Sequence, residues 1–253
     1  ILAPEPIAEE AVATIAVHTT EEASFASGLR RKGDGYTLRA GEIRHATYGV
    51  FGVIERETIE LPGPLSLQSG GDATRRAQIE LVTLPGRLEA SPSLLARWLR
   101  ESAAAVAAFW GGFPVDRACV VLIPSPDYDR VAHGKVVAAG GATVVIQVGA
   151  EADEAALFDD WILVHELFHL GFPSLLGGGK WLDEGLATYY EPIIRARAGW
   201  RSPELVWEEM SSDMPRGLAA LEQLGLEQTR SYAGIYWGGA ILSLLQNEGD
   251  LAL

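Results

Sequence analysis

Cysteine is almost missing from this chain, which has a single one, Cys119, among its 253 residues. An intrachain disulfide is therefore excluded. The apolar neighbours in the run ACVVLI indicate that this thiol is buried in the core. Apolar runs long enough to span a membrane are also missing, because none approaches the roughly 20 residues that a bilayer requires.

A starting methionine and a basic signal segment are missing too. The first residues, ILAPEPIAEEA, carry acids where a secretory signal peptide carries basic residues. The absent methionine indicates a processed or trimmed chain, from which an export signal could have been removed. We expect a periplasmic or secreted location in that case and a cytoplasmic location otherwise.

Positive charge is scarce, since 20 basic residues face 34 acidic ones and the formal net charge is -14. The run Arg30, Arg31, Lys32 is the only basic cluster in the sequence. Nucleic acids are bound mainly through basic patches that release counterions from the phosphates. We therefore expect no nucleic-acid partner, and the sequence leaves the oligomeric state open.

The first third of the chain has the pattern of short strands. Apolar residues alternate with polar ones, as Ile79 and Leu81 do with Gln78 and Glu80, which is typical of half-buried antiparallel strands. This pattern runs from residue 11 to about residue 88. We therefore predict a β-rich N-terminal portion over residues 1–88.

The pattern changes at Ser91, where a capping residue followed by proline predicts a helix that stops at Gly111. Two runs typical of strands follow, at 117–125 and 142–149, with a glycine-containing loop between them. Nearly everything after Ala150 has the character of helix. We therefore predict an α+β fold with a second domain over residues 89–253.

Two histidines and an acid interrupt the apolar segment VHELFHLGF. His165 and His169 are four residues apart, so on a helix they lie on one face and can bind the same ion. Glu166 projects beside that pair, where a carboxylate can hold a water on the metal without being a ligand. Imidazole and carboxylate donors suit Zn²⁺ in a tetrahedral site that keeps one position open.

Capping residues give the limits of this helix. We expect it to begin at Asp159 or Asp160 and to end at Gly171 and Pro173. On this motif alone, histidines without a metal, at the helix surface or satisfied in the core, remain an alternative. A third ligand is needed to decide between the two interpretations.

Glu184, in the following segment WLDEGLATYYE, is the candidate for that third ligand. Fourteen residues separate it from His169, which allows a turn and a second, antiparallel helix. Such a helix can bring the carboxylate over the histidine pair. We expect Asp183, beside it, to cap the new helix.

HELFH followed by WLDEGLATYYE resembles the gluzincin metallopeptidases, specifically the alanyl aminopeptidase family and the related glycyl aminopeptidases. The segment SYAGIYWGGAILSLLQ resembles the start of the family's Y-x-K-G-A helix. The resemblance extends over residues 160–246. It implies a thermolysin-like zinc peptidase domain over residues 89–253, truncated at its C-terminus relative to the family.

The resemblance also implies roles for individual residues. The acid of the family's N-E-G motif is the third zinc ligand, which corresponds to Glu184. Glu166 would act as general base on a zinc-activated water, and Tyr236, or failing it Tyr232, would stabilise the oxyanion. Glu191, two turns after Glu184, would accept a hydrogen bond from the second ring nitrogen of a zinc-bound histidine. The substrate would be a peptide or protein.

The substrate-binding strand departs from the family pattern. Where the family has Gly-x-Met-Glu-Asn, this chain has GGATVVIQ at 140–147, with no acid to hold a substrate's α-amino group. We expect Gly141, Ala142 and Thr143 to contact the substrate, at a sheet edge that an extended peptide can join. Endopeptidase and aminopeptidase action are both left open. A non-catalytic, zinc-stabilised peptide-binding or scaffold module is the alternative from another class.

Overall fold

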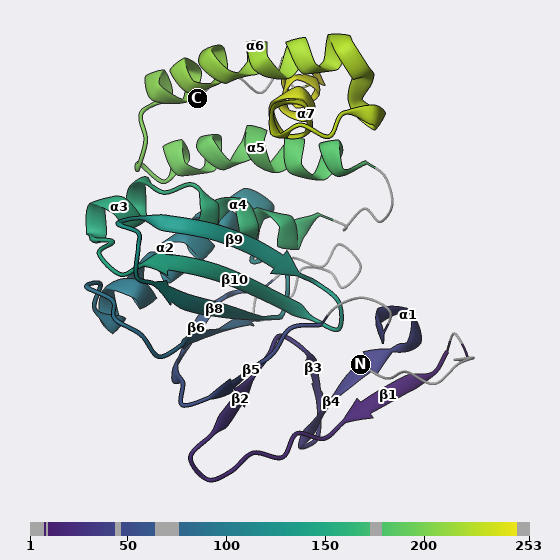
Figure 1. Cartoon of the computed structure of the whole chain (residues 1–253), viewed down its shortest axis with the longest axis vertical. Helices are drawn as coiled ribbons and strands as arrows, with labels where there is room; N and C mark the ends of the chain where they lie inside the picture. Colours follow the sequence, from purple (N-terminus) through teal and green to yellow (C-terminus); the bar gives the residue numbers. More distant parts are fainter. Residues whose placement is uncertain (1–7, 9, 44–46, 64–75, 173–178, 247–253) are drawn as a thin grey trace.

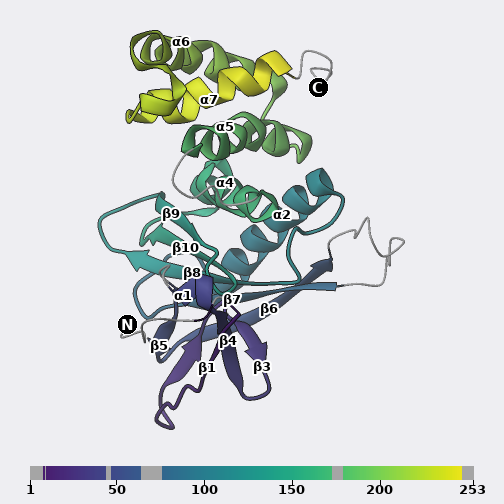
Figure 2. The same cartoon turned by 90° about the vertical axis from the view of Figure 1, so that its right-hand side faces the viewer.

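The structure is a computed structural model that describes residues 8, 10–43, 47–63, 76–172 and 179–246, and it has three tiers (Figure 1). Small N-terminal strands form the lowest tier, a larger sheet with helices on one face forms the middle, and three helices form the top. The view turned by 90° shows the same order (Figure 2). The mixed α+β character predicted from the sequence is confirmed.

The elements follow one another in a simple order, with most strands before most helices. The strands are β1 (Val12–Ile15), β2 (Ser24–Ala26), β3 (Arg30–Lys32), β4 (Gly35–Arg39), β5 (Val50–Gly52), β6 (Glu55–Pro62), β7 (Arg76–Thr83), β8 (Arg117–Ser125), β9 (Val131–Val137) and β10 (Ala142–Gly149). The helices are α1 (Ala40–Ile43), α2 (Pro92–Trp110), α3 (Glu154–Asp159), α4 (Ile162–Phe168), the 3₁₀ turn η1 (His169–Gly171), α5 (Lys180–Arg197), α6 (Pro203–Gln228) and α7 (Tyr232–Gln246).

The central sheet has five strands in the order β6-β7-β8-β10-β9. β7, β8 and β10 run parallel, while β6 and β9 are antiparallel to their neighbours at the two edges. The sequence predicts a loop where β9 forms, because Gly134 between the polar His133 and Lys135 lacks the alternation of a strand. The predicted division after residue 88 falls between β7 and α2, and β7 pairs with β8 across it.

Both faces of this sheet are covered, and β8 shows how its residues are divided between them. Ala118, Val120 and Leu122 belong to the core that α2 and α4 share with the sheet. The alternate residues Cys119 and Val121 pack on the opposite face, in a cluster with residues of β2 and β5. The buried thiol predicted from the sequence is confirmed.

Capping sets the limits of α2, as the sequence predicts. Ser91 accepts a hydrogen bond from the N–H of Leu94, and Pro92 occupies the first turn. The helix ends at Gly111, whose φ of 75° lies in the left-handed region. The buried face of α2 packs against the sheet and against α4. It includes Trp98, Leu99 and Val106.

The helix that carries the histidines begins later than predicted. Asp159 is the last residue of α3, and α4 starts only at Ile162. Asp160 lies in the sharp turn between them, where its Oδ1 accepts the N–H of Ile162 at 2.7 Å. Two helices, α3 and α4, therefore replace the one continuous helix that was expected, and Asp160 caps the second. Pro173, the predicted end of that helix, lies outside the described residues.

Replacing Asp160 by Asn is expected to weaken the pH dependence of stability. Burial raises the pKa of Asp160 from 3.8 to about 7, although the N–H of Ile162 and the charge of Arg195 oppose the shift. The folded protein therefore binds more protons than the unfolded chain between these values, so its free energy of unfolding falls as pH rises through that window. The loss should reach roughly 2 to 4 kcal/mol above pH 7.

Urea unfolding at pH 5 and pH 8, with a chelator present, measures this effect. Asn keeps the acceptor for Ile162 but cannot ionise, so the variant should lose less stability between the two pH values than the wild type. Asp153→Asn is the matched control, because Asp153 caps α3 through Ala156 from an exposed position. Equal pH dependence in the wild type and Asp160→Asn would contradict the prediction.

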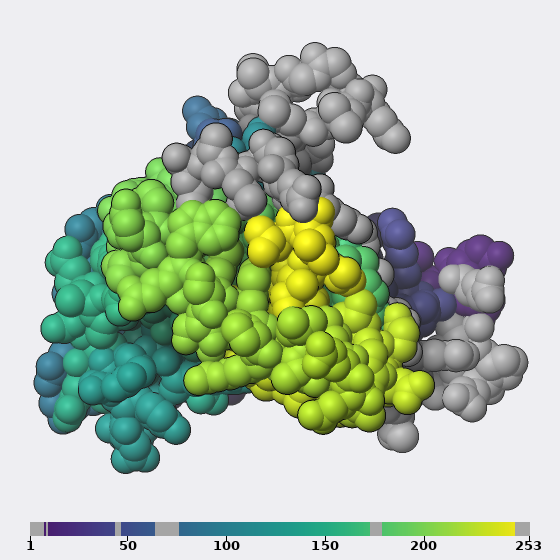
Figure 3. All heavy atoms as spheres, turned by 90° about the horizontal axis from the view of Figure 1, so that it is seen from above, coloured from purple at the N-terminus to yellow at the C-terminus, as the bar shows by residue number. Residues whose placement is uncertain are grey.

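The upper tier consists of α5, α6 and α7, and the view from above shows α6 and α7 covering this face (Figure 3). α5 and α7 approach so closely that a Cβ at Gly185 would lie 2.4 Å from backbone atoms of Gly239. Among the described helices, we find none with the length and apolar character that a membrane crossing needs.

Candidate metal centre

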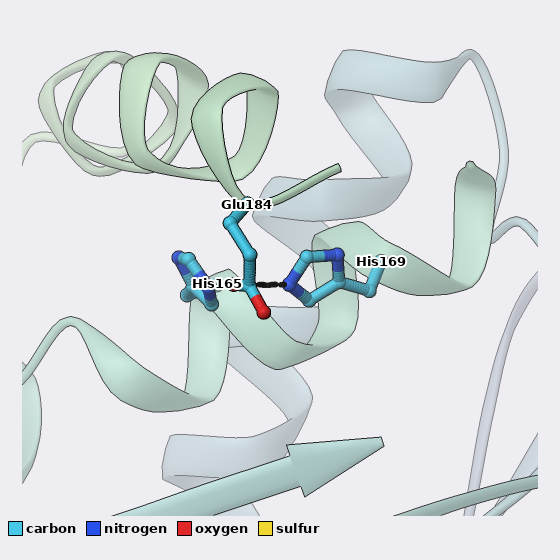
Figure 4. A group of neighbouring side chains, drawn as sticks. All are labelled: His165, His169 and Glu184. Atoms are coloured by element: carbon cyan, nitrogen blue, oxygen red, sulfur yellow. Dashed lines mark hydrogen bonds and ion pairs between the residues drawn. The ribbon is translucent and has the colours of Figure 1, made fainter. Parts of the chain in front are cut away.

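Two helices bring three donor atoms together between the middle and upper tiers (Figure 4). His165 and His169 rise from α4 and its 3₁₀ extension, and Glu184 descends from α5. The two Nε2 atoms are 3.1 Å apart, and Oε2 of Glu184 lies 3.2 Å from His165 Nε2 and 3.5 Å from His169 Nε2. Among the described residues, these three form the group whose donor atoms could hold one metal ion.

The spacing of these atoms fits a zinc ion. Tetrahedral coordination with bonds of about 2.0 to 2.1 Å places the ligand atoms about 3.3 to 3.4 Å from one another. The three observed separations, 3.1, 3.2 and 3.5 Å, lie around that value. Three protein donors leave the fourth position free, as in catalytic rather than structural zinc sites.

The electrostatics of the group also favour a bound cation. Burial disfavours the charged form of His169, but hydrogen bonds and charge from Asp183 and Glu184 outweigh it and raise its pKa to about 10. Burial likewise opposes ionisation of Glu184, yet the two histidines hold its pKa well below its usual range. The site thus stabilises positive charge at the point where the three donors meet.

Asp183 has a different role from the one predicted. α5 begins at Lys180 after Gly179, so the prediction that Asp183 caps this helix is wrong. Instead, Oδ1 of Asp183 lies 2.8 Å from Nδ1 of His169. A carboxylate that accepts the proton of Nδ1 fixes the tautomer whose Nε2 lone pair is free to bind a metal.

We expect Asp183→Asn to weaken zinc binding by about 10- to 100-fold, the usual effect of losing an acid behind a ligand histidine. The amide is a poorer acceptor for Nδ1–H and carries no charge. Titration with a zinc-buffered indicator measures the affinity, and circular dichroism checks the fold. Asp213→Asn on α6 is a control outside the ligand group, and equal affinities for Asp183→Asn and the wild type would exclude this role for Asp183.

Apart from Glu184 at its Nε2, His165 is held by aromatic packing. Its ring is 2% exposed, forms a T-shaped pair with Trp161, and stacks on Tyr236 with centroids 5.8 Å apart. Within the described part of the chain, its Nδ1 has no hydrogen-bond partner. The hydroxyl of Thr188 bonds the backbone carbonyl of Glu184, which fixes the turn that carries the third donor.

Glu191, predicted to support a zinc ligand, has another partner in the structure. Its Oε1 accepts a hydrogen bond from Nη1 of the buried Arg195 at 3.0 Å, and Arg195 in turn donates to the carbonyl of Asp159. Among the described residues, no hydrogen bond or ion pair joins Glu191 to either imidazole. Instead, Glu191 and Arg195 connect α5 to the end of α3. Asp183, not Glu191, makes the expected carboxylate contact with a ligand histidine, His169.

Glu166 lies in the same cleft, beside β9. It lines the cleft, its carboxylate accepts the N–H of Val136, and a Cβ on Gly134 would lie 2.6 Å from its Cγ. Burial raises the pKa of Glu166 to about 7, with nearby His169 opposing the shift. Glycine at 134 is what gives this side chain its space.

Tyr236 approaches the same cleft from α7. Its ring lies between His165 and Tyr232, with the two tyrosine centroids 4.2 Å apart. Burial, together with the charge of and a hydrogen bond to Glu184, raises the pKa of Tyr236, so its hydroxyl is protonated at neutral pH. Tyr232 is more exposed and lines a separate pocket with Glu191 and Trp161, so it is less well placed than Tyr236.

A cleft of about 530 Å³ adjoins the donor group. Gly141 and Ala142, predicted as substrate contacts, line it, whereas Thr143 is buried and its Oγ1 accepts the N–H of Gly28. The prediction that β10 forms a sheet edge is wrong, because β10 pairs with β8 on one side and β9 on the other. The edge beside the donors is β9, whose residues His133 to Val136 line the cleft.

Solved structures with a similar fold were found, all at low sequence identity. No protein-family model and no curated protein matches the sequence. Among solved structures, an M1 zinc metallopeptidase from Deinococcus radiodurans matches with a TM-score of 0.52 at 18% identity, covering 94% of this chain and 52% of that one. An aminopeptidase N family protein from Idiomarina loihiensis gives 0.64 at 12% identity, with 97% and 48% covered.

Native yeast LTA4 hydrolase also matches, with a TM-score of 0.55 at 13% identity, covering 94% of this chain and 37% of that one. At such identities the similarity shows the fold of these proteins. The chain spans about half of the length of the first two and little more than a third of the last.

Proposed function

We propose that this chain is a zinc-dependent metallopeptidase of the gluzincin type, with a thermolysin-like catalytic domain over residues 89–253. The observation that carries the proposal is the triangle of His165, His169 and Glu184, with sides close to those of a tetrahedral zinc site. Structural neighbours that include an M1 zinc metallopeptidase support it at the level of the fold.

Each side chain of the centre has a place in the reaction. His165, His169 and Glu184 would hold a zinc ion, which would supply Lewis acidity to the reaction. Glu166 would take a proton from the attacking water and deliver it to the leaving amine. Tyr236 donates its O–H to the oxygen on which negative charge develops. Asp183 holds His169 in the tautomer that the reaction needs.

The edge of β9 is the place where we propose that a substrate strand binds. The N–H of Val136 reaches Glu166, so this residue presents its backbone away from β10. Backbone groups two residues apart in a strand face the same side, so Gly134 presents its N–H and C=O there as well. An extended peptide that pairs with the backbone of Gly134 would lie beside the general base, which itself accepts the N–H of Val136.

Removing the metal tests this proposal most directly. We expect the purified protein to contain about one zinc per chain and to cleave an unstructured protein in a chelator-sensitive way, with activity restored by added zinc. Parallel assays with amino-acid anilides separate endopeptidase from aminopeptidase action. A protein that binds no zinc at micromolar concentration, or one whose cleavage survives chelation, would refute the proposal.

A further inference from the structure

Each acid that lines the described part of the cleft has a partner within the protein. Among the described lining residues they are Glu166, Asp183 and Glu184. Glu184 contacts both histidines, Asp183 holds Nδ1 of His169, and Glu166 accepts the N–H of Val136. In this part of the chain, no lining carboxylate is left to bind the ammonium group of a substrate.

Unlike the acids, one positively charged side chain of the cleft, that of Lys135, has no charged partner among the described residues. The whole sequence has only three lysines, Lys32, Lys135 and Lys180, and the last two line the cleft. Lys180 is largely exposed, with its Nζ 3.8 Å from Oε1 of Glu184. Arg30, the third lining cation, is paired with Glu42. Lys135 is exposed on β9 and forms no ion pair among the described residues, so its charge is available to a ligand.

The pleat of β9 fixes the side on which Lys135 stands. A Cβ at Gly134 would meet Ile162 and Glu166, so position 134 faces α4. Side chains alternate along a strand, so Lys135 projects to the opposite face. A peptide strand beside β9 would place every second side chain on that face, within reach of the ammonium group.

We propose that the cleft selects peptides that carry an acidic side chain on the face of Lys135, and that it does not require a free N-terminal amine. This selectivity rests on the proposed function for its substrate strand. A substrate carboxylate on that face would pair with the ammonium group of Lys135, whereas the protein as a whole is strongly acidic, with a net charge of -14. An N-terminal ammonium on that face would meet the charge of Lys135.

Peptide binding to the zinc-loaded Glu166→Gln variant tests this selectivity without turnover. The probes are fluorescent peptides, acetylated and amidated at their ends, in which one Glu or its isostere Gln is moved through successive positions. At one or more alternate positions we expect Glu to bind about fivefold more tightly than Gln, and the preference should shrink as salt is added. Adding Lys135→Glu should abolish or reverse it. Adding Lys32→Glu, the same charge change on β3 away from the cleft, should leave it intact.

The outcomes separate this inference from the proposed function. A Glu preference that depends on Lys135 supports the inference even if the wild-type protein cleaves nothing, in which case only the peptidase proposal fails. Equal binding of Glu and Gln peptides overturns the inference, as does a preference that survives Lys135→Glu. Tighter binding on freeing the N-terminal amine, or a dependence on a free C-terminal carboxylate in place of the side chain, also overturns it.

Discussion

The Glu166→Gln protein should keep its zinc and lose peptidase activity by about 10²- to 10⁴-fold, the range that general base catalysis contributes. Gln has the size of Glu and fits beside Gly134, but it cannot take a proton from water. None of the three proposed metal donors is changed. Metal content by mass spectrometry and kcat on an unstructured protein substrate measure the two effects separately.

A matched neutralisation shows whether the loss is specific. Glu208 lies exposed on α6, so Glu208→Gln removes the same charge without touching the centre. It should retain wild-type kcat. If Glu166→Gln and the wild type turned over equally, the proposed mechanism would be wrong, whereas loss of zinc from Glu166→Gln would assign Glu166 a part in holding the metal.

Tyr236→Phe should lower kcat by about a hundredfold with little change in KM or in zinc content. The hydroxyl is a donor that acts mainly when charge develops on the carbonyl oxygen, so its loss affects the transition state more than the bound substrate. The ring itself is kept, and with it the stacking against His165. Steady-state kinetics on one peptide substrate separate kcat from KM.

Tyr232→Phe is the natural comparison, since Tyr232 stacks on Tyr236 but is 56% exposed. Loss of its hydroxyl should change kcat less than about twofold, within the range of surface substitutions. A larger loss in Tyr232→Phe than in Tyr236→Phe would exchange the two roles. Equal, small effects would show that neither hydroxyl stabilises the oxyanion.

Local spacing explains what the sequence could predict. The limits of α2 depend on Ser91 and Gly111, residues that act within one turn of themselves. The histidine pair depends on helical spacing alone, and a second helix close behind it could present Glu184 to the same point. The structure brings these three side chains together.

The missed features depend on contacts that no local pattern encodes. β9 is a strand because β10 offers it an edge, although Gly134 and its polar neighbours lack strand-like alternation. With β9 at that edge, β10 becomes an interior strand, so the proposed substrate-binding edge is β9 and not β10. Asp183 stands in the first turn of α5, where an acid is favoured by the helix dipole in any case, so only its distance to His169 shows its second role.

The contact between Gly185 and Gly239 has a consequence for the centre below it. Gly185 follows the proposed ligand Glu184, and Gly239 lies one turn beyond the proposed oxyanion donor Tyr236. Main chain touches main chain there, so no rotamer can lengthen or shorten the gap between the two helices. The backbone contact therefore fixes the distance between the helix that carries Glu184 and the helix that carries Tyr236. Changes in side-chain packing elsewhere in the upper tier would not alter this distance.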